Sequence, residues 1–207
     1  MDARMATLAQ SGPLDSPASA PASLRRWSRD DYYAMAQLGI IQPDERVELL
    51  DGQVIALSPI NPPHRKVMIR LYDLLRDAFG EEAYVMPESP VTLGDQSEPQ
   101  PDIAVAVGPE AAYDHRHPNP ADLLLVVEIA DSSLRRDRTA KRAAYAAAGI
   151  CEYWIADLAS GTLDVFRSPA GGKYTDVRTY TSAEVVTPLR APDRSIPVNA
   201  FLPAVAP

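Results

Sequence analysis

The pattern of apolar and polar positions is clearest in the segment Leu123–Ala130, LLLVVEIA. Five consecutive apolar residues precede a single carboxylate, Glu128. A run of this kind is typical of a strand that is buried on both faces. Removing a carboxylate from water costs several kcal/mol unless it is paired. The segment therefore predicts a buried strand and a partner for Glu128.

Helical spacing and helix-end signals predict three helices. In the clearest case, between His64 and Phe79, apolar residues recur at three- and four-residue intervals. Ser28 is a typical N-cap for an earlier helix, and a glycine follows each helical segment. The predicted helices span residues 30–39, 64–79 and 137–148.

Alternating segments predict the strands of one sheet. Asp51-Gly52 joins two such segments and is a strong signal for a two-residue hairpin turn. Beyond Lys173 we expect only a short strand or two among irregular segments. The order of elements predicts a mixed α/β (α+β) domain with a central mixed sheet flanked by helices. The predicted strands flank Asp51-Gly52 and cover residues 84–93, 101–107, 123–130, 151–157 and 162–168.

The composition of the 207 residues adds limits on location and domain organisation. Residues 1–23 are rich in Ala, Ser and Pro and predict a disordered tail, and residues 24–207 predict a single domain. No run of 18 apolar residues is present, so we expect no membrane-spanning helix. Cys151 is the only cysteine, which excludes an internal disulfide and a cysteine-based zinc site. A cytoplasmic location is the simplest interpretation.

The net charge of −8 argues against nonspecific binding to DNA or to anionic membranes. One basic cluster runs against this average, and it begins seven residues after Glu128. Its arginines are candidates for contacts with DNA, although such clusters usually form a solvated face. The cluster consists of Arg135, Arg136, Arg138, Lys141 and Arg142.

Two carboxylates and a lysine suggest metal-assisted hydrolysis. Asp102 begins one predicted strand, Glu128 lies near the end of another, and Lys141 follows on a helix. Two carboxylates on adjacent strands, with the backbone carbonyl of Ile129, suit Mg²⁺ or Mn²⁺. Each residue also has a purely structural interpretation. Pro101-Asp102 could form a turn, Glu128 could pair with an arginine or lysine, and Lys141 could be a solvated helix residue.

Four segments together resemble the Uma-two family of restriction endonucleases, within the PD-(D/E)XK superfamily. The resemblance covers residues 24–203, and its most specific part places Glu, Ser-Ser, Asp, Lys, Tyr, Gly-Ile and Glu-Tyr-Trp at matching spacing. The segments are WSRDDYYAM (Trp27–Met35), RVELLDGQVIALSP (Arg46–Pro59), QPDIAV (Gln100–Val105) and the long block Leu123–Asp157.

The resemblance implies a restriction endonuclease-like fold and a nuclease site with a divalent metal. Asp102 and Glu128 correspond to metal ligands, and Glu48 to an acidic residue from an earlier element. Ala130 occupies the lysine position of the E-x-K motif, so Lys141 on the next helix would replace that lysine. Residues expected in supporting roles are Gln100, Ser132, Asp137 (as a helix cap), Tyr145 and His64.

Three functions fit these observations. The first is a metal-dependent endodeoxyribonuclease, expected as a homodimer so that both strands can be cut. The second is a catalytically inactive binding or regulatory module, which a direct Glu128–Lys141 contact in a dry site would favour. The third is hydrolysis of another phosphodiester, such as RNA.

Overall fold

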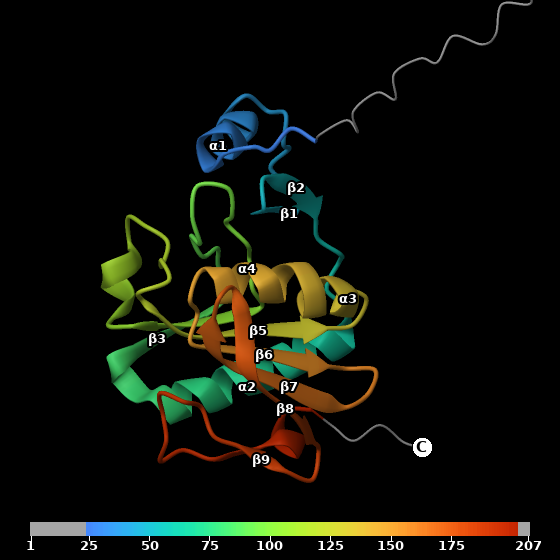
Figure 1. Ribbon diagram of the computed structural model, residues 1–207, viewed down its shortest axis with the longest axis vertical. Coiled ribbons are helices and arrows are strands. Elements are labelled where there is room, and N and C mark those ends of the chain that lie inside the picture. The colour runs from blue at the N-terminus through green and yellow to red at the C-terminus, as the bar shows by residue number, and fades with distance from the viewer. Residues whose placement is uncertain (1–23, 203–207) are drawn as a thin grey trace, which may run out of the picture.

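The computed structural model describes residues 24–202 and contains one large sheet with helices on both faces (Figure 1). Within these residues, no helix combines the length and apolar character needed to cross a membrane. The predicted tail, residues 1–23, lies outside the described residues. The elements are α1 (Arg29–Gln37), β1 (Val47–Leu50), β2 (Gln53–Ala56), α2 (Pro62–Phe79), β3 (Ala83–Pro87), β4 (Ile103–Val107), β5 (Leu123–Ala130), α3 (Leu134–Arg136), α4 (Arg142–Ala147), β6 (Glu152–Asp157), β7 (Thr162–Ala170), β8 (Lys173–Thr181), β9 (Val185–Val186) and β10 (Ile196–Pro197).

The main sheet has six strands in the order β3-β4-β5-β6-β7-β8. Only β5 and β6 run parallel, and the other neighbouring pairs are antiparallel. Parallel neighbours need a crossover, which here carries α3, a π-helical turn and α4. The predicted α/β class and the central mixed sheet flanked by helices are confirmed.

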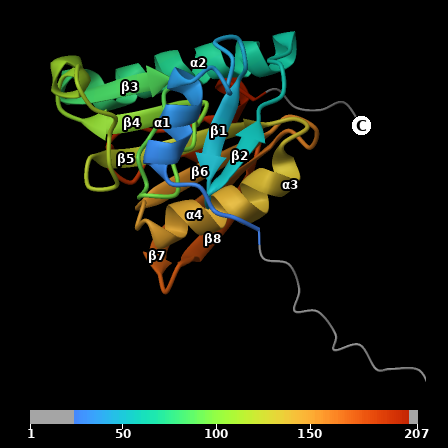
Figure 2. The same ribbon diagram turned by 90° about the horizontal axis from the view of Figure 1, so that it is seen from above.

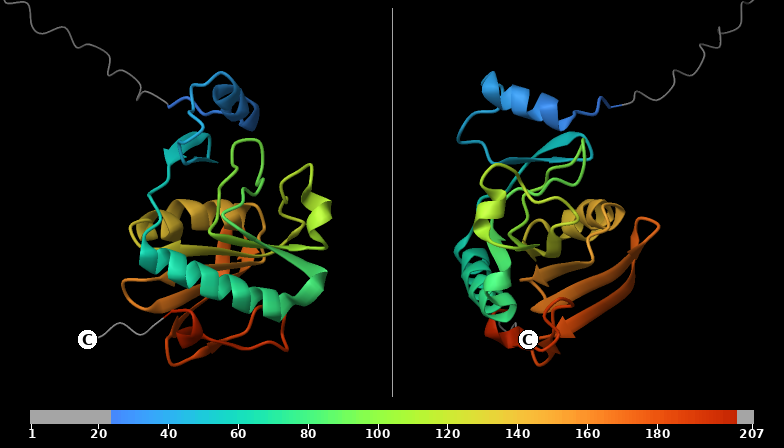
Figure 3. Two further views of the ribbon diagram at one scale, coloured as in Figure 1. Left: turned by 180° about the vertical axis from the view of Figure 1, so that it is seen from behind. Right: turned by 90° about the vertical axis from the view of Figure 1, so that its left-hand side faces the viewer.

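The two faces of the sheet hold separate cores, with α2 and α4 on opposite sides (Figure 3). On β5, Val127 and Ile129 pack in the same core as α2. Val126 and Ala130 pack in the core that contains Tyr145 of α4. Because side chains alternate along a strand, Glu128 points toward the α4 side.

The β1–β2 hairpin lies beside α4, next to α1 (Figure 2). Its turn, Asp51-Gly52, has positive φ angles of 49° and 67°, as the sequence signal predicted. Glycine is needed at position 52 because a Cβ there would come within 2.6 Å of the Arg26 Cβ. The hairpin carries Glu48 toward the α4 side of the sheet.

Three predicted segments were wrong in extent. The strand expected over residues 84–93 ends at Pro87, because Glu88 adopts a positive φ of 45° and breaks the ladder. The helix expected from Asp137 begins at Leu134 and widens into a π-helical turn over Asp137–Lys141. The region beyond Lys173, expected to be mostly irregular, begins with the nine-residue strand β8, which pairs with β7.

Candidate active site

A polar pocket of about 80 Å³ lies where β4 begins and β5 ends, beside the first turn of α2. A volume of this size has room for water molecules or a hydrated ion. The polar residues lining the pocket are Arg46, Ser58, Asn61, His64, Glu88, Gln100, Asp102, Glu128, Asp131, Ser132, Ser133, Arg136, Asp137 and Lys141.

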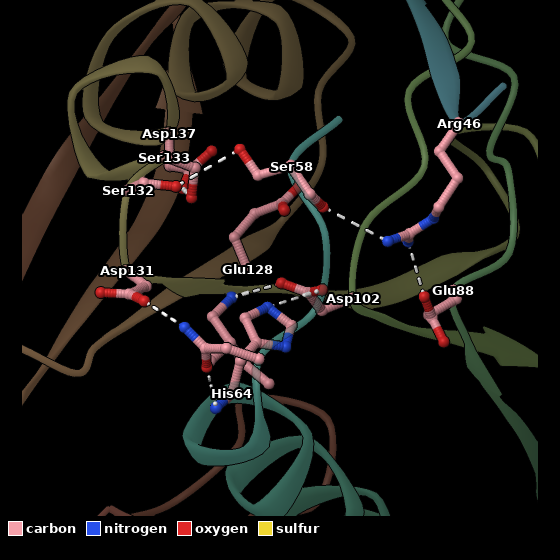
Figure 4. Close-up of polar contacts among 12 residues, drawn as sticks. Arg46, Ser58, His64, Glu88, Asp102, Glu128, Asp131, Ser132, Ser133 and Asp137 are labelled. Atoms are coloured by element: carbon pink, nitrogen blue, oxygen red, sulfur yellow. Dashed lines mark hydrogen bonds and ion pairs between the residues drawn. The ribbon is translucent and has the colours of Figure 1, made fainter. Parts of the chain in front are cut away.

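Asp102 is held from two directions (Figure 4). Its Oδ2 accepts the backbone N–H of Ile129 at 2.6 Å, which ties the start of β4 to the neighbouring strand. Its Oδ1 lies 3.1 Å from Nε2 of His64. Asn61 caps α2 by accepting the His64 backbone N–H at 3.0 Å, and so fixes the position from which His64 reaches Asp102.

Glu128 is almost fully buried, and one of its carboxylate oxygens accepts two hydrogen bonds. Its Oε1 accepts from the Lys141 ammonium at 2.8 Å and from the Tyr145 hydroxyl at 2.9 Å. Lys141 and Tyr145 are four residues apart on the helical crossover, so they reach the same carboxylate. Glu128 Oε2 has no hydrogen-bond donor among residues 24–202.

Glu48 contacts Lys141 and is the fourth of the site residues that the family resemblance implied, with Asp102, Glu128 and Lys141. Its Oε2 lies 3.1 Å from the Lys141 ammonium and accepts the backbone N–H of Gln100 at 3.1 Å. Within the described part of the chain, its Oε1 is buried without a partner. The fold thus brings Glu48, Glu128 and Lys141 into contact, with Asp102 on the same pocket.

The pocket carries more negative than positive charge. Burial alone would lower the pKa of Lys141, but attraction by Glu128, Glu48 and Asp137 outweighs it, so that pKa lies above its usual range. Lys141 is therefore an ammonium at neutral pH. Burial raises the pKa of Glu128, and the Lys141 charge opposes that rise. A second cation would relieve the repulsion among these carboxylates.

His64 carries a balance of the same kind. Burial lowers its pKa, but the hydrogen bond and negative charge of Asp102 outweigh this effect and raise the pKa above its usual value. The ring is therefore held as a donor to Asp102.

A family model described as "Uma2: Putative restriction endonuclease" matches residues 29–199. The chain belongs to the Uma2 family. A crystal structure described as a "putative nuclease belonging to DUF820", from Anabaena variabilis, is similar to this Uma2 chain with a TM-score of 0.64 and 15% sequence identity. The match covers 84% of this chain and 96% of the other, and at this identity it shows the shared fold. No curated protein matched.

One supporting residue of this Uma2 chain, Asp137, differs from its predicted role. Asp137 was expected to cap a helix, but it lies inside the helical crossover and accepts from the Ser133 hydroxyl at 2.6 Å. Ser133 precedes α3 without a side-chain cap bond, and Ser132 Oγ lies 3.3 Å from Ser58 Oγ. Ser132 and Ser133 both line the pocket.

Gln100 also lines the pocket, and its side-chain amide donates to the backbone carbonyl of Glu88. Sequence reasoning missed two other contacts at this rim. Arg46 pairs with Glu88 at 2.7 Å, and Asn61 donates to Asp131. The signal for Asn61 was available, because asparagine before Pro62 is a typical N-cap.

The four candidate DNA-contacting arginines of the Uma2 chain fall into two pairs. Arg138 forms ion pairs with the buried carboxylates of Asp157 and Asp164, and Arg142 lies over the Phe166 ring. These two contacts place Arg138 and Arg142 away from the pocket. Arg135 and Arg136 make no ion pair within residues 24–202, and both line a second cavity beside the pocket.

Proposed function

We propose that this chain is an endonuclease that hydrolyses phosphodiester bonds in DNA with Mg²⁺ or Mn²⁺. The observation that carries the proposal is the meeting of two carboxylates, Asp102 and Glu128, from neighbouring strands, with a buried ammonium 2.8 Å from the second. Membership of a family described as restriction endonucleases supports the same reaction class.

The pocket suits a small hard cation. Among the described residues, no three His, Cys, Asp or Glu side chains gather closely enough to hold a metal by themselves. Mg²⁺ is commonly held by one or two carboxylates, with waters and substrate oxygens completing its shell. The ion would be held by Asp102, by Glu128 Oε2 and by the Ile129 backbone carbonyl. The excess negative charge around Lys141 favours such binding.

The chain's own groups have separate tasks in this proposal. His64 and the Ile129 N–H fix the two oxygens of Asp102, and Tyr145 orients Glu128. Lys141 donates toward the phosphate as negative charge develops on its oxygens. When bound, the metal polarises the phosphodiester and makes a water more acidic.

One observation favours an inactive binding module as the second candidate. The Glu128–Lys141 contact is direct and both side chains are buried, which is the arrangement expected of a structural ion pair. The same contact also places Lys141 beside a carboxylate that the active site requires. The solvated neighbour Asp102, whose side chain is 16% exposed, distinguishes this pocket from a dry one.

The decisive test is cleavage of supercoiled plasmid and of short DNA and RNA oligonucleotides with Mg²⁺, with Mn²⁺ and with EDTA. Wild type is compared with Asp102→Ala and Lys141→Ala from the same purification. We expect cleavage of DNA that needs metal and is lost in both variants. Cleavage that survives Asp102→Ala would overturn the assigned site, and cleavage of RNA alone would overturn the substrate.

Absence of cleavage for every substrate, together with absence of Mn²⁺ binding in calorimetry, would favour the inactive module. The homodimer and the cytoplasmic location stay predictions. Linearisation of plasmid without accumulation of nicked circles would support a dimer that cuts both strands, and light scattering would measure the oligomeric state directly.

A further inference from the structure

A second cavity, of about 420 Å³, opens next to the candidate active site. The two cavities share four lining residues, so they adjoin each other. The second differs in character, because it has no carboxylate in its lining and is formed by hydroxyls, a methyl group and two arginines. Its lining residues are Ser58, Ser132, Ser133, Arg135, Arg136, Thr139 and Ala140.

Arg135 and Arg136 have no competing ion-pair partner among residues 24–202, unlike their neighbour Arg138. The Nε of Arg136 is buried and has no hydrogen-bond acceptor there, although Arg136 lines both cavities. A buried donor without an acceptor costs free energy, so this atom favours a ligand that accepts hydrogen bonds. Guanidinium groups bind phosphate oxygens with matching planar geometry.

The hydroxyls of Ser58 and Ser132 lie 3.3 Å apart on the boundary between the two cavities (Figure 4). Hydroxyls donate to phosphate oxygens as well as to each other. The boundary therefore offers further donors between the acidic pocket and the two arginines.

We propose that this second cavity binds the backbone phosphate next to the one that is cleaved. The proposal rests on the proposed nuclease function, because it takes the acidic pocket as the place of the scissile phosphate. The metal would neutralise the scissile phosphate, and Arg135 and Arg136 would neutralise its neighbour. The chain then acts on a nucleic acid strand and not on an isolated phosphodiester.

The flanking phosphate explains how a chain of net charge −8 binds a polyanion. Each neutralised phosphate of a single strand changes the slope of log K against log salt by about 0.7. The second cavity supplies one such contact with the only two arginines of the crossover that the described residues leave without an ion pair or a stacked ring.

The test compares the double variant Arg135→Gln/Arg136→Gln with the matched control Arg142→Gln. Arg142 lies on the same crossover but over Phe166, away from the cavity. Fluorescence anisotropy in EDTA measures binding of a labelled single-stranded DNA oligonucleotide at several salt concentrations. We expect the double variant to bind about tenfold more weakly, since hydrogen bonds to charged groups contribute at least that factor. Its salt slope should fall by about 0.7.

Cleavage gives a second measurement of the same contact. In wild type, an uncharged methylphosphonate beside the scissile position should reduce the cleavage rate. In the double variant the same replacement should have no further effect. Arg142→Gln should behave as wild type in both assays.

The proposal is overturned if the double variant binds DNA with wild-type affinity and salt slope, whether or not the chain cleaves. If no metal supports cleavage but binding still depends on the two arginines, the nuclease function fails and the phosphate site stands. The two proposals therefore fail separately.

Discussion

At the scale of single residues, Lys141 is the buried cation between the carboxylates of the site. It is almost fully buried and lies within 3.1 Å of two carboxylates, Glu48 and Glu128. The family resemblance predicted that Lys141 replaces the lysine expected at Ala130, and in the structure the Lys141 ammonium contacts Glu128 from the helical crossover.

Replacing Lys141 with methionine should destabilise the fold by about 3 kcal/mol, because it leaves two buried carboxylates without a cation. The double variant Lys141→Met/Glu128→Gln should recover part of this loss, since the amide is neutral. Urea unfolding in EDTA measures both free energies. A stability of Lys141→Met equal to that of wild type would show that the ion pair has no net structural role.

Asp102 is expected to act on the metal more than on the fold. In Asp102→Asn the amide oxygen still accepts the Ile129 N–H and only the His64 contact is weakened, so the free energy of unfolding should fall by less than in Lys141→Met. Binding of Mn²⁺, measured by calorimetry, should be lost. Asp131→Asn is the matched control, since Asp131 lines the same pocket and is bonded to Asn61. Equal Mn²⁺ affinities for all three proteins would contradict the assigned ligand.

At the scale of elements, the helical crossover between β5 and β6 builds one wall of the site. Its π-helical turn, Asp137–Lys141, lies where a regular helix was expected. The Tyr153 hydroxyl donates to the buried Asp137 backbone carbonyl at 3.2 Å, and the Arg142 backbone N–H donates to the same carbonyl across the wide turn. Single π-helical turns are frequent at functional sites, and here the turn carries Lys141.

The other end of the sheet is fixed by a second buried network. Glu152 accepts from Arg167 at 2.6 Å and from the Leu189 backbone N–H at 2.7 Å. Arg167 also donates to the Thr187 carbonyl. These contacts attach the segment after β8 to the sheet.

Arg167→Ala should cost about 3 kcal/mol, because Glu152 would remain buried without its cation. Amide exchange should accelerate first around Leu189, the residue that Glu152 holds. Arg178→Ala, which removes an exposed pair with Glu184, should have a much smaller effect. Similar decreases in the free energy of unfolding for the two variants would show that burial does not determine how much an ion pair contributes to stability.

The sequence predicted the elements whose signals are local. The Asp51-Gly52 turn, the apolar period of α2 and the buried run of β5 each lie within a short window. The extent of β3, the strand β8 and the π-helical turn depend on pairing or packing with distant residues, so a local pattern does not show them.

Local spacing and the family resemblance were enough to select Asp102, Glu128 and Lys141 as candidates, and the structure places all three on one pocket. The sequence did not show that Arg138 forms ion pairs while Arg136 faces the pocket, because Asp157 and Asp164 reach Arg138 only in the folded sheet.

At the scale of the whole molecule, buried tyrosine hydroxyls make the stability of the fold decrease at alkaline pH. Burial raises the pKa of Tyr145, Tyr153 and Tyr174 because a phenolate is poorly solvated inside the protein. The unfolded value is about 10. Because the pKa of these phenols is higher in the folded protein, their contribution to the free energy of unfolding is complete below about pH 10 and is lost as the pH rises above it.

The free energy of unfolding should therefore fall steadily above about pH 10. Urea unfolding at a series of pH values measures the slope. Tyr174→Phe should make the slope shallower without weakening the fold at neutral pH, since the Tyr174 hydroxyl is buried without a partner in residues 24–202. A stability that is independent of pH across this range would contradict the assignment.

The parallel pairing of β5 and β6 has a consequence for how the chain tolerates insertions. Because Glu128 and Lys141 lie at the two ends of one covalent segment, an added residue between them would shift the ammonium relative to its carboxylate even if the sheet still formed. The turn Gly171-Gly172, which joins β7 to β8, carries no such constraint, and Gly171 is exposed. A peptide tag or fluorescent reporter belongs at this turn, where it labels the protein and leaves the spacing of the site unchanged.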